Sequence, residues 1–190
     1  RAGEFHDYAP NGLQVEGTRE VKHIVLGVSA SLGLIDEAAR RGADVVLVHH
    51  GWFWKGESPR IAGVKGCRIR HLMQSGMHLV GYHLPLDAHE TVGNNAELAR
   101  VLGLTIESRH GEYGLLHVGE IISGAMLAAD FAQRVNAALG RAPLLVGDAQ
   151  KIVRRIGWCS GAAQDELAAA AALGCDLYLS GEIREHTTFE

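Results

Sequence analysis

Two short stretches of this chain carry side chains that bind metal ions, and each follows an apolar run. "VVLVHH" ends in the adjacent residues His49 and His50, and His83 and Asp87 follow the run 77–82. Neutral imidazole is a ligand of Zn, Fe, Ni and Cu, and a two-metal site also needs carboxylates. Adjacent side chains of a flat strand point to opposite faces, so two neighbouring histidines suit one ion each better than one shared ion. The pattern therefore predicts a metal site at the ends of these two runs.

A structural role is the alternative for the same side chains. His49 or His50 could cap a strand through backbone hydrogen bonds, and His83 could be a hydrogen-bonded core residue. His89, in the same loop as Asp87, is a further potential ligand. The occurrence of both motifs directly after apolar runs favours the metal site over the purely structural reading.

Three aromatic residues follow the histidine pair. Trp52, Phe53 and Trp54 are expected first as core or interface residues, because large rings bury the most apolar area. A second reading makes them an apolar wall that stacks on a flat substrate.

The elements that must position these residues alternate between strands and helices. Residues 21–30 are rich in β-branched side chains, which predicts a strand, and the apolar residues of 31–42 recur at the spacing of a helix. Residues 43–48 are again apolar, so the three segments together predict a βαβ unit. The continuous apolar strands favour a mainly parallel sheet covered on both faces, and therefore an α/β fold. The further expected helices are 63–76, 94–103, 123–140 with Ser123 as N-cap, and 163–174; the further expected strands are 77–83, 115–122, 142–147, 151–160 and 175–182.

The chain also contains an internal repeat. "GADVVLVHH" (42–50) aligns with "GCDLYLSGE" (174–182), and "LGVSASLGLIDEA" (26–38) aligns with "IGWCSGAAQDELA" (156–168) at the same offset. This predicts two similar α/β units, residues 1–110 with the metal-ligand loops and residues 111–190, which we expect to continue past Glu190. Both units should present ligand sites at the carboxyl ends of their parallel strands.

Composition excludes several classes of function. The 190 residues carry 18 basic and 22 acidic side chains without a basic stripe, so no nucleic-acid partner is expected. No apolar run is long enough to span a bilayer, and no signal peptide is visible, so no membrane association is expected. Three widely spaced cysteines without a CxxC pair indicate a reducing environment, and we expect a cytoplasmic protein.

Other catalytic and binding motifs are weak in this sequence. No GxSxG nucleophile elbow is present. The Gly/Ser turns "GVSASLG" (27–33) and "CSGAAQ" (159–164) could seat a phosphate, but their spacing matches neither a P-loop nor GxGxxG. "PNGLQ" (10–14) indicates only a turn.

Three longer stretches resemble the NIF-three-like family, which includes the GTP cyclohydrolase 1 type 2 homologs. They are "DYAPNGLQVEG" (7–17), "GADVVLVHHGWFWKG" (42–56) and "GYHLPLDAHETVGNNAELA" (81–99), and the resemblance covers essentially the whole chain. It implies a two-domain α/β protomer, a homohexameric ring and a dinuclear metal site that faces its interior.

The resemblance also assigns roles to individual residues. It implies that His49, His50 and Asp87 are metal ligands and that His83 lies close to the site. His and Asp ligands suit two divalent ions, such as Zn, Mn, Fe or Ni. A further His-x3-Glu ligand pair of the family has no match here, because the surroundings of His186 and Glu190 differ, so those ligands are expected beyond residue 190.

Two functions follow from this reading. The first is a metal-dependent hydrolase that acts on a nucleotide-like substrate, either by GTP cyclohydrolase-like ring opening or as a nucleotide phosphoesterase, with His83 transferring a proton. The alternative is a non-catalytic ring that binds metal or regulates other proteins. Metal content, together with release of formate or phosphate from nucleotides, distinguishes the two.

Overall fold

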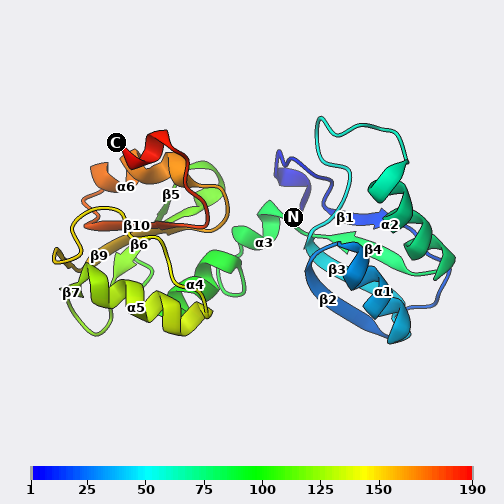
Figure 1. The fold of residues 1–190 in the computed structure, drawn as a ribbon, viewed down its shortest axis with the longest axis horizontal. Helices are drawn as coiled ribbons and strands as arrows, with labels where there is room; N and C mark the ends of the chain where they lie inside the picture. Colours follow the sequence, from blue (N-terminus) through cyan, green and yellow to red (C-terminus); the bar gives the residue numbers. More distant parts are fainter. Residues whose placement is uncertain (1, 190) are drawn as a thin grey trace. The chain divides into compact units, whose positions relative to one another are not determined.

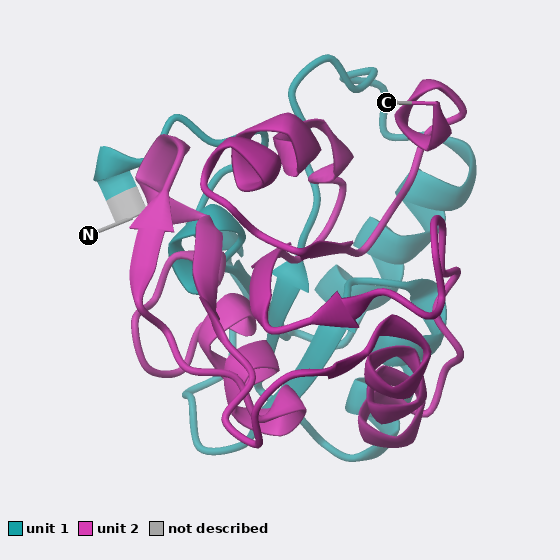
Figure 2. Cartoon of the chain, turned by 90° about the vertical axis from the view of Figure 1, so that its left-hand side faces the viewer, with its two compact units in different colours: residues 1–86 teal, residues 87–190 magenta. Residues whose placement is uncertain are grey.

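The computed structural model describes residues 2–189 and divides the chain into two α/β units, residues 1–86 and 87–190 (Figures 1 and 2). The internal repeat in the sequence predicts a later boundary, after residue 110. The difference arises because the helix Asn94–Leu102 contributes Leu102 to the hydrophobic core around Trp158. That helix therefore belongs to the second unit.

The first unit is built on a four-stranded sheet with the order β1-β4-β3-β2 (Figure 1). Strands β2, β3 and β4 are parallel, and β1 pairs with β4 in the antiparallel direction. Its elements in chain order are η1 (Ala2–Glu4), β1 (Gly12–Val15), β2 (Ile24–Ser29), α1 (Leu32–Arg40), β3 (Val45–His50), α2 (Gly63–Gln74), β4 (His78–Gly81) and the start of α3 (Leu84–Asp87).

Helices α1 and α2 pack against one face of this sheet. Ile35 of α1 and Leu72 of α2 are fully buried in one core cluster with Val46 of β3. The opposite face of the edge strand β2 is open, since Leu26 and Val28 are 71% and 69% exposed. The expectation of a sheet covered on both faces therefore does not hold for β2.

The second unit contains another four-stranded sheet, with the order β10-β9-β6-β5, and a two-stranded sheet of β7 and β8. Strands β9 and β10 are parallel, and the remaining pairs are antiparallel. Its further elements are α4 (Asn94–Leu102), β5 (Ser108–His110), η2 (Glu112–Gly114), β6 (Leu116–Glu120), β7 (Met126–Leu127), α5 (Ala128–Leu139), β8 (Ile152–Val153), β9 (Arg155–Cys159), η3 (Gln164–Glu166), α6 (Leu167–Ala172), β10 (Leu177–Ser180) and η4 (His186–Thr188).

Strand β9 is packed on both of its faces. Trp158 is fully buried in a core cluster with Phe131 of α5. On the other face, a Cβ atom added to Gly157 would lie 2.9 Å from the Cβ atom of Ala170 in α6. Glycine at this position lets α6 approach the strand closely, so helices cover both faces of β9.

The predicted internal duplication is confirmed by equivalent hydrogen bonds in the two units. The carboxylate of Asp44 accepts from the backbone N–H groups of Lys22 and His23, each at 2.9 Å. Asp176 accepts in the same way from Arg154 and Arg155, again at 2.9 Å. These residues have the same offset as the repeat in the sequence. Each aspartate therefore ties together the starts of a parallel pair, β2–β3 or β9–β10.

Several local predictions differ from the structure. Helix α5 begins at Ala128 rather than at residue 123, because Leu127 occupies the cap position, and the Ser123 hydroxyl instead accepts from Arg134. Residues 142–147 form no strand. Residues 12–14 of the predicted turn 10–14 instead belong to the strand β1, which pairs with β4.

The longest helices, α2 and α5, have 12 residues each. A helix that crosses a bilayer needs about 20 predominantly apolar residues. Among residues 2–189, none of the helices is long and apolar enough to do so.

His117 is a titratable side chain in the core of the second unit. It is 1% exposed, its Nδ1 lies 3.0 Å from the carbonyl oxygen of Leu115, and its Nε2 is buried without a hydrogen-bond partner. Burial disfavours the charged imidazolium and, with a smaller effect of the Arg109 charge, lowers the pKa of His117 below its ordinary value of 6.5.

We predict that His117 makes the folded chain less stable at acid pH. Below pH 6.5 the unfolded chain takes up a proton at this site before the folded chain does, so the free energy of unfolding falls as the pH drops towards the lowered pKa. Urea denaturation between pH 8 and pH 5 should show a shallower pH dependence for His117→Phe than for the wild type. The exposed His23→Phe is the control, and equal slopes for wild type and His117→Phe would refute the prediction.

Candidate metal centre

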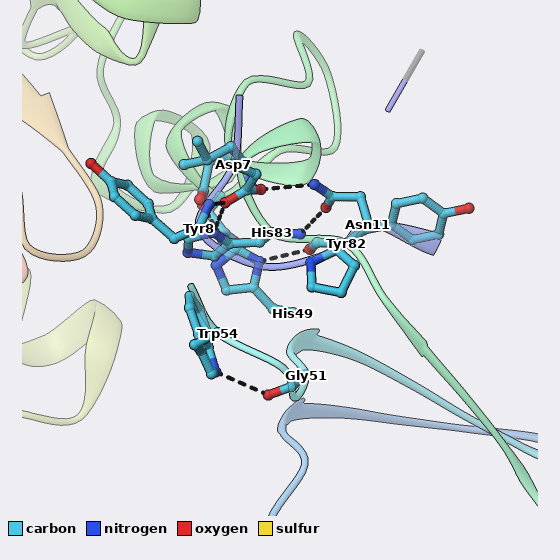
Figure 3. Close-up of polar contacts among 12 residues, drawn as sticks. Asp7, Tyr8, Asn11, His49, Gly51, Trp54, Tyr82 and His83 are labelled. Carbon is cyan, nitrogen blue, oxygen red and sulfur yellow. Dashed lines mark hydrogen bonds and ion pairs between the residues drawn. The ribbon is translucent and has the colours of Figure 1, made fainter. Parts of the chain in front are cut away.

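Three of the four histidine and aspartate residues predicted for the site belong to the first unit, and they converge there. One ligand nitrogen each of His49, His50 and His83 lies within 4.8 Å of the other two. The ring centroids of His49 and His50 are 4.4 Å apart, and that of His83 lies 5.0 Å from His49 and 5.5 Å from His50. The first two end β3 and the third follows β4, so neighbouring parallel strands deliver all three rings. Figure 3 shows His49 and His83.

Hydrogen bonds to oxygen fix the tautomer of two of these rings. The Nδ1 atom of His49 lies 2.9 Å from the carbonyl oxygen of Tyr82, and that of His83 lies 2.6 Å from a carboxylate oxygen of Asp7 (Figure 3). Both oxygens can only accept, so each neutral ring carries its proton on Nδ1 and its lone pair on Nε2. This is the form in which an imidazole binds a metal ion, with its other nitrogen held by a second residue.

His50 is held by a hydroxyl group. Its Nδ1 lies 3.1 Å from the Oγ atom of Ser29, and the parallel register of β2 and β3 places these two residues opposite each other. A serine hydroxyl can accept the Nδ1 proton and still donate its own hydrogen. The same tautomer is therefore available to all three histidines.

Asp7 is the buried anchor of the His83 loop. Its side chain is 2% exposed and accepts from Asn11 Nδ2 at 2.8 Å and from the Leu84 N–H at 3.0 Å, in addition to His83. Burial opposes ionisation of this carboxyl, but the hydrogen bonds from Asn11, His83 and Leu84 outweigh it and hold the pKa of Asp7 below its usual value. Asn11 also accepts from the backbone N–H of His83 at 2.8 Å.

Gln14 holds the loop that follows the other two histidines. Its Oε1 accepts from the Trp52 N–H at 2.7 Å, and its Nε2 donates to the carbonyl oxygen of Pro10 at 2.7 Å. A Cβ atom at Gly51 would lie 2.1 Å from the Gln14 side chain, so a larger residue here would displace the Gln14 amide from the Trp52 N–H. We call Asp7, Asn11 and Gln14 the N-terminal clamp. The sequence predicts only a turn at residues 10–14 and no role for Asp7.

The three aromatic residues have three different environments. Trp52 is 3% exposed in the core, and its Nε1 donates to the carbonyl oxygen of Ala30 at 2.8 Å. Phe53 is partly exposed at a φ of 66°. Trp54 is half-buried and meets the His83 ring edge-on at 5.0 Å, so it forms an aromatic wall beside the three histidines (Figure 3).

Asp87 lies in the second unit, at the end of α3. It is 8% exposed and accepts from Asn94 Nδ2 at 2.6 Å and from the Ser160 hydroxyl at 3.3 Å. Its role as a metal ligand remains a prediction from the sequence. His89 accepts from the backbone N–H groups of its own loop through Nδ1. His186 lies in η4, 3.8 Å from Asp165, and Glu190 lies outside the described residues.

The donor set of the first unit fits a divalent transition metal ion. Imidazole nitrogen suits Zn, Fe, Ni and Cu, and a bound ion lies roughly 2.0–2.1 Å from each nitrogen for Zn. Nitrogens within 4.8 Å of one another can reach one ion or two adjacent ions without a large rearrangement. Hydrogen-bonded Nδ1 atoms are typical of histidines that bind metals.

Comparison with known sequences matches almost the whole chain to one protein family. The model of the family Duf34/NIF3 (NGG1p interacting factor 3) matches residues 2–190. A protein from Pseudomonas aeruginosa named "GTP cyclohydrolase 1 type 2 homolog" is 50% identical over 188 residues, which make up 98% of this chain and 74% of that protein. A protein of the same name from Escherichia coli K12 is 48% identical over 182 residues, or 95% of this chain and 72% of the relative.

Solved structures show the same fold. The structure titled "protein ybgI, unknown function" superposes with a TM-score of 0.93 at 45% identity and covers 99% of this chain and 75% of that chain. TTHA1606 from Thermus thermophilus gives a TM-score of 0.81 at 34% identity, covering 97% of this chain and 73% of that chain.

We predict that Asp7→Asn weakens metal binding while the chain remains folded. The variant loosens the loop at His83 and Leu84. This loop directly follows Tyr82, whose carbonyl oxygen holds His49 Nδ1, and loss of such an outer partner lowers metal affinity by about 10–100-fold. Titration calorimetry with Zn²⁺, with circular dichroism to confirm folding, measures the effect.

Asp36→Asn is the matched control, because Asp36 forms an equivalent bond to His71 Nδ1, at 2.9 Å, on the exposed surface. It should bind metal like the wild type. Wild-type affinity in Asp7→Asn would show that the clamp does not support the centre.

Proposed function

Since this chain belongs to the Duf34/NIF3 family, we propose that it is a metal-dependent hydrolase with a dinuclear centre that acts on a nucleotide-like small molecule. The observation that carries the proposal is the convergence of His49, His50 and His83, two of them with Nδ1 held by an obligate acceptor. The name of the bacterial relatives supports a purine nucleotide as the substrate.

In this proposal His49 and His50 each hold one divalent ion through Nε2. Asp87 is proposed as a further ligand from its position in the sequence, and the ions are Zn, Mn, Fe or Ni. Bound divalent ions would activate a water molecule as nucleophile and polarise the bond to be cleaved.

The remaining chemistry belongs to side chains of the first unit. Asp7 fixes the ring of His83 through Nδ1, which leaves Nε2 as the nitrogen that takes up or releases a proton. Trp54 packs edge-on against this ring. His83 is therefore proposed as the proton-transfer residue rather than as an essential ligand.

We further propose that the protein assembles into a homohexameric ring, as the resemblance of its sequence implies. The exposed apolar side chains of β2, including Leu26 and Val28, support burial of this strand against another copy. Light scattering after size-exclusion chromatography measures the oligomer, and a monomer at micromolar concentration would contradict this part of the proposal.

We predict that the histidines separate into two groups by metal content and turnover. His49→Ala and His50→Ala should each lose about half of the bound metal or more, because each removes a ligand of one of two ions. His83→Gln should retain its metal and lose turnover by about 10²–10⁴-fold. Elemental analysis and the release of formate or phosphate from GTP and a nucleotide panel provide the two readouts.

The exposed His71→Ala on α2 is the control and should match the wild type in both readouts. Full metal content in His49→Ala would refute the ligand assignment. Loss of metal from His83→Gln would make His83 a ligand. If the protein binds metal stoichiometrically but turns over no nucleotide, it is a non-catalytic metal-binding protein and not a hydrolase.

A further inference from the structure

A hollow of about 360 Å³ opens beside His50 in the first unit. Small-molecule sites in proteins typically have volumes of roughly 300–1,000 Å³. Ser29, Ser31, Trp54 and Arg68 contribute to its wall, and none of the described residues that line it is acidic. Arg68 is the only one of these lining residues with a permanent charge, so the fixed charge on this wall is positive, and through His50 the hollow adjoins the candidate metal centre.

The guanidinium of Arg68 is held in place without a carboxylate. Its Nη1 donates to the carbonyl oxygen of Ala30 at 3.4 Å, and it lies 5.8 Å from the centroid of the Trp52 ring. Its Nε is buried without an acceptor, and among residues 2–189 it forms no ion pair. By contrast, Arg109 and Arg155 bond to Glu90 and Glu107. The N–H groups of Arg68 other than the buried Nε–H and the one bonded to Ala30 are thus left for a bound anion.

Two hydroxyl groups add donors to the same wall. Ser31 Oγ accepts from the Leu34 N–H at 3.2 Å, and Ser29 Oγ accepts from His50 in the tautomer that binds metal. A hydroxyl that accepts keeps its own hydrogen to donate. Arg68, Ser29 and Ser31 therefore offer hydrogen-bond donors from three side chains. A phosphoryl group has three oxygens to accept from them, whereas a carboxylate has only two.

We propose that this hollow is the phosphoryl-binding subsite of the protein and that Arg68 is its specificity-determining residue. A planar guanidinium pairs with phosphate oxygens through two parallel hydrogen bonds, which a lysine ammonium cannot reproduce. That the bound phosphoryl group belongs to the substrate of the metal centre rests on the proposed function. Trp54 would then face the part of the substrate between the phosphoryl group and the histidines.

Titration of the full chain with inorganic phosphate, followed by NMR, tests the subsite. In protein as purified and after chelator treatment, phosphate should shift the Arg68 Nε–H signal and the backbone amides of Ser29 and Ser31 in a saturable way. Arg68→Met, which keeps an apolar stem over Trp52, should weaken phosphate binding about tenfold or more, and Arg68→Lys by less.

Arg70→Met is the matched control, since Arg70 is exposed on the same helix, and it should bind phosphate like the wild type. Acetate, titrated in parallel, should bind more weakly than phosphate. Unchanged phosphate affinity in Arg68→Met, acetate binding as tight as phosphate binding, or shifts confined to other residues would overturn the subsite. If Arg68→Met does not fold, the wild-type shifts and Arg68→Lys still decide the question.

The chelator-treated sample separates this inference from the proposed function. Phosphate binding that persists without metal supports the subsite even if no nucleotide is hydrolysed. Turnover of nucleotides combined with phosphate binding that ignores Arg68 would leave the hydrolase intact and refute the subsite.

Discussion

The parallel register of β2, β3 and β4 is the constraint on which the rest of the site depends. It places Ser29 opposite His50 and ends β3 and β4 at the same edge, where the carbonyl oxygen of Tyr82 meets His49. A slip by one residue would turn every side chain of a strand to the other face of the sheet. The histidines then could not share one site, so the apolar packing that fixes the register also fixes the chemistry.

A second layer of hydrogen bonds turns this placement into a defined protonation state. The rings of His49 and His83 each have Nδ1 on an oxygen that can only accept, and the N-terminal clamp holds the loops on either side of them. A buried polar group is stable when its hydrogen bonds are satisfied, and four groups donate hydrogen bonds to the Asp7 carboxylate. The clamp thus links the first turn of the chain to two loops far along the sequence.

The elements predicted well are those with strong apolar patterning, such as β3, α1 and the repeated β9–α6–β10 unit. The metal motif could be predicted from the sequence because His49, His50 and His83 directly follow apolar runs. The N-terminal clamp could not be predicted from the sequence. Asp7 acts through a contact with His83, which is 76 positions away, and no local pattern encodes that contact. The close approach of Gln14 to Gly51 is likewise a contact between distant segments that no local pattern encodes. Tertiary contacts decided these cases.

An anomalous difference map from crystals of the full chain loaded with Zn²⁺ tests the central claim most directly. The claim is that backbone register and Nδ1 hydrogen bonds direct Nε2 of the histidines to the metal. It predicts density about 2.0–2.1 Å from Nε2 of His49 and His50, with the bonds of their Nδ1 atoms to Tyr82 and Ser29 intact. Metal coordinated through Nδ1, or density away from both histidines, would contradict it.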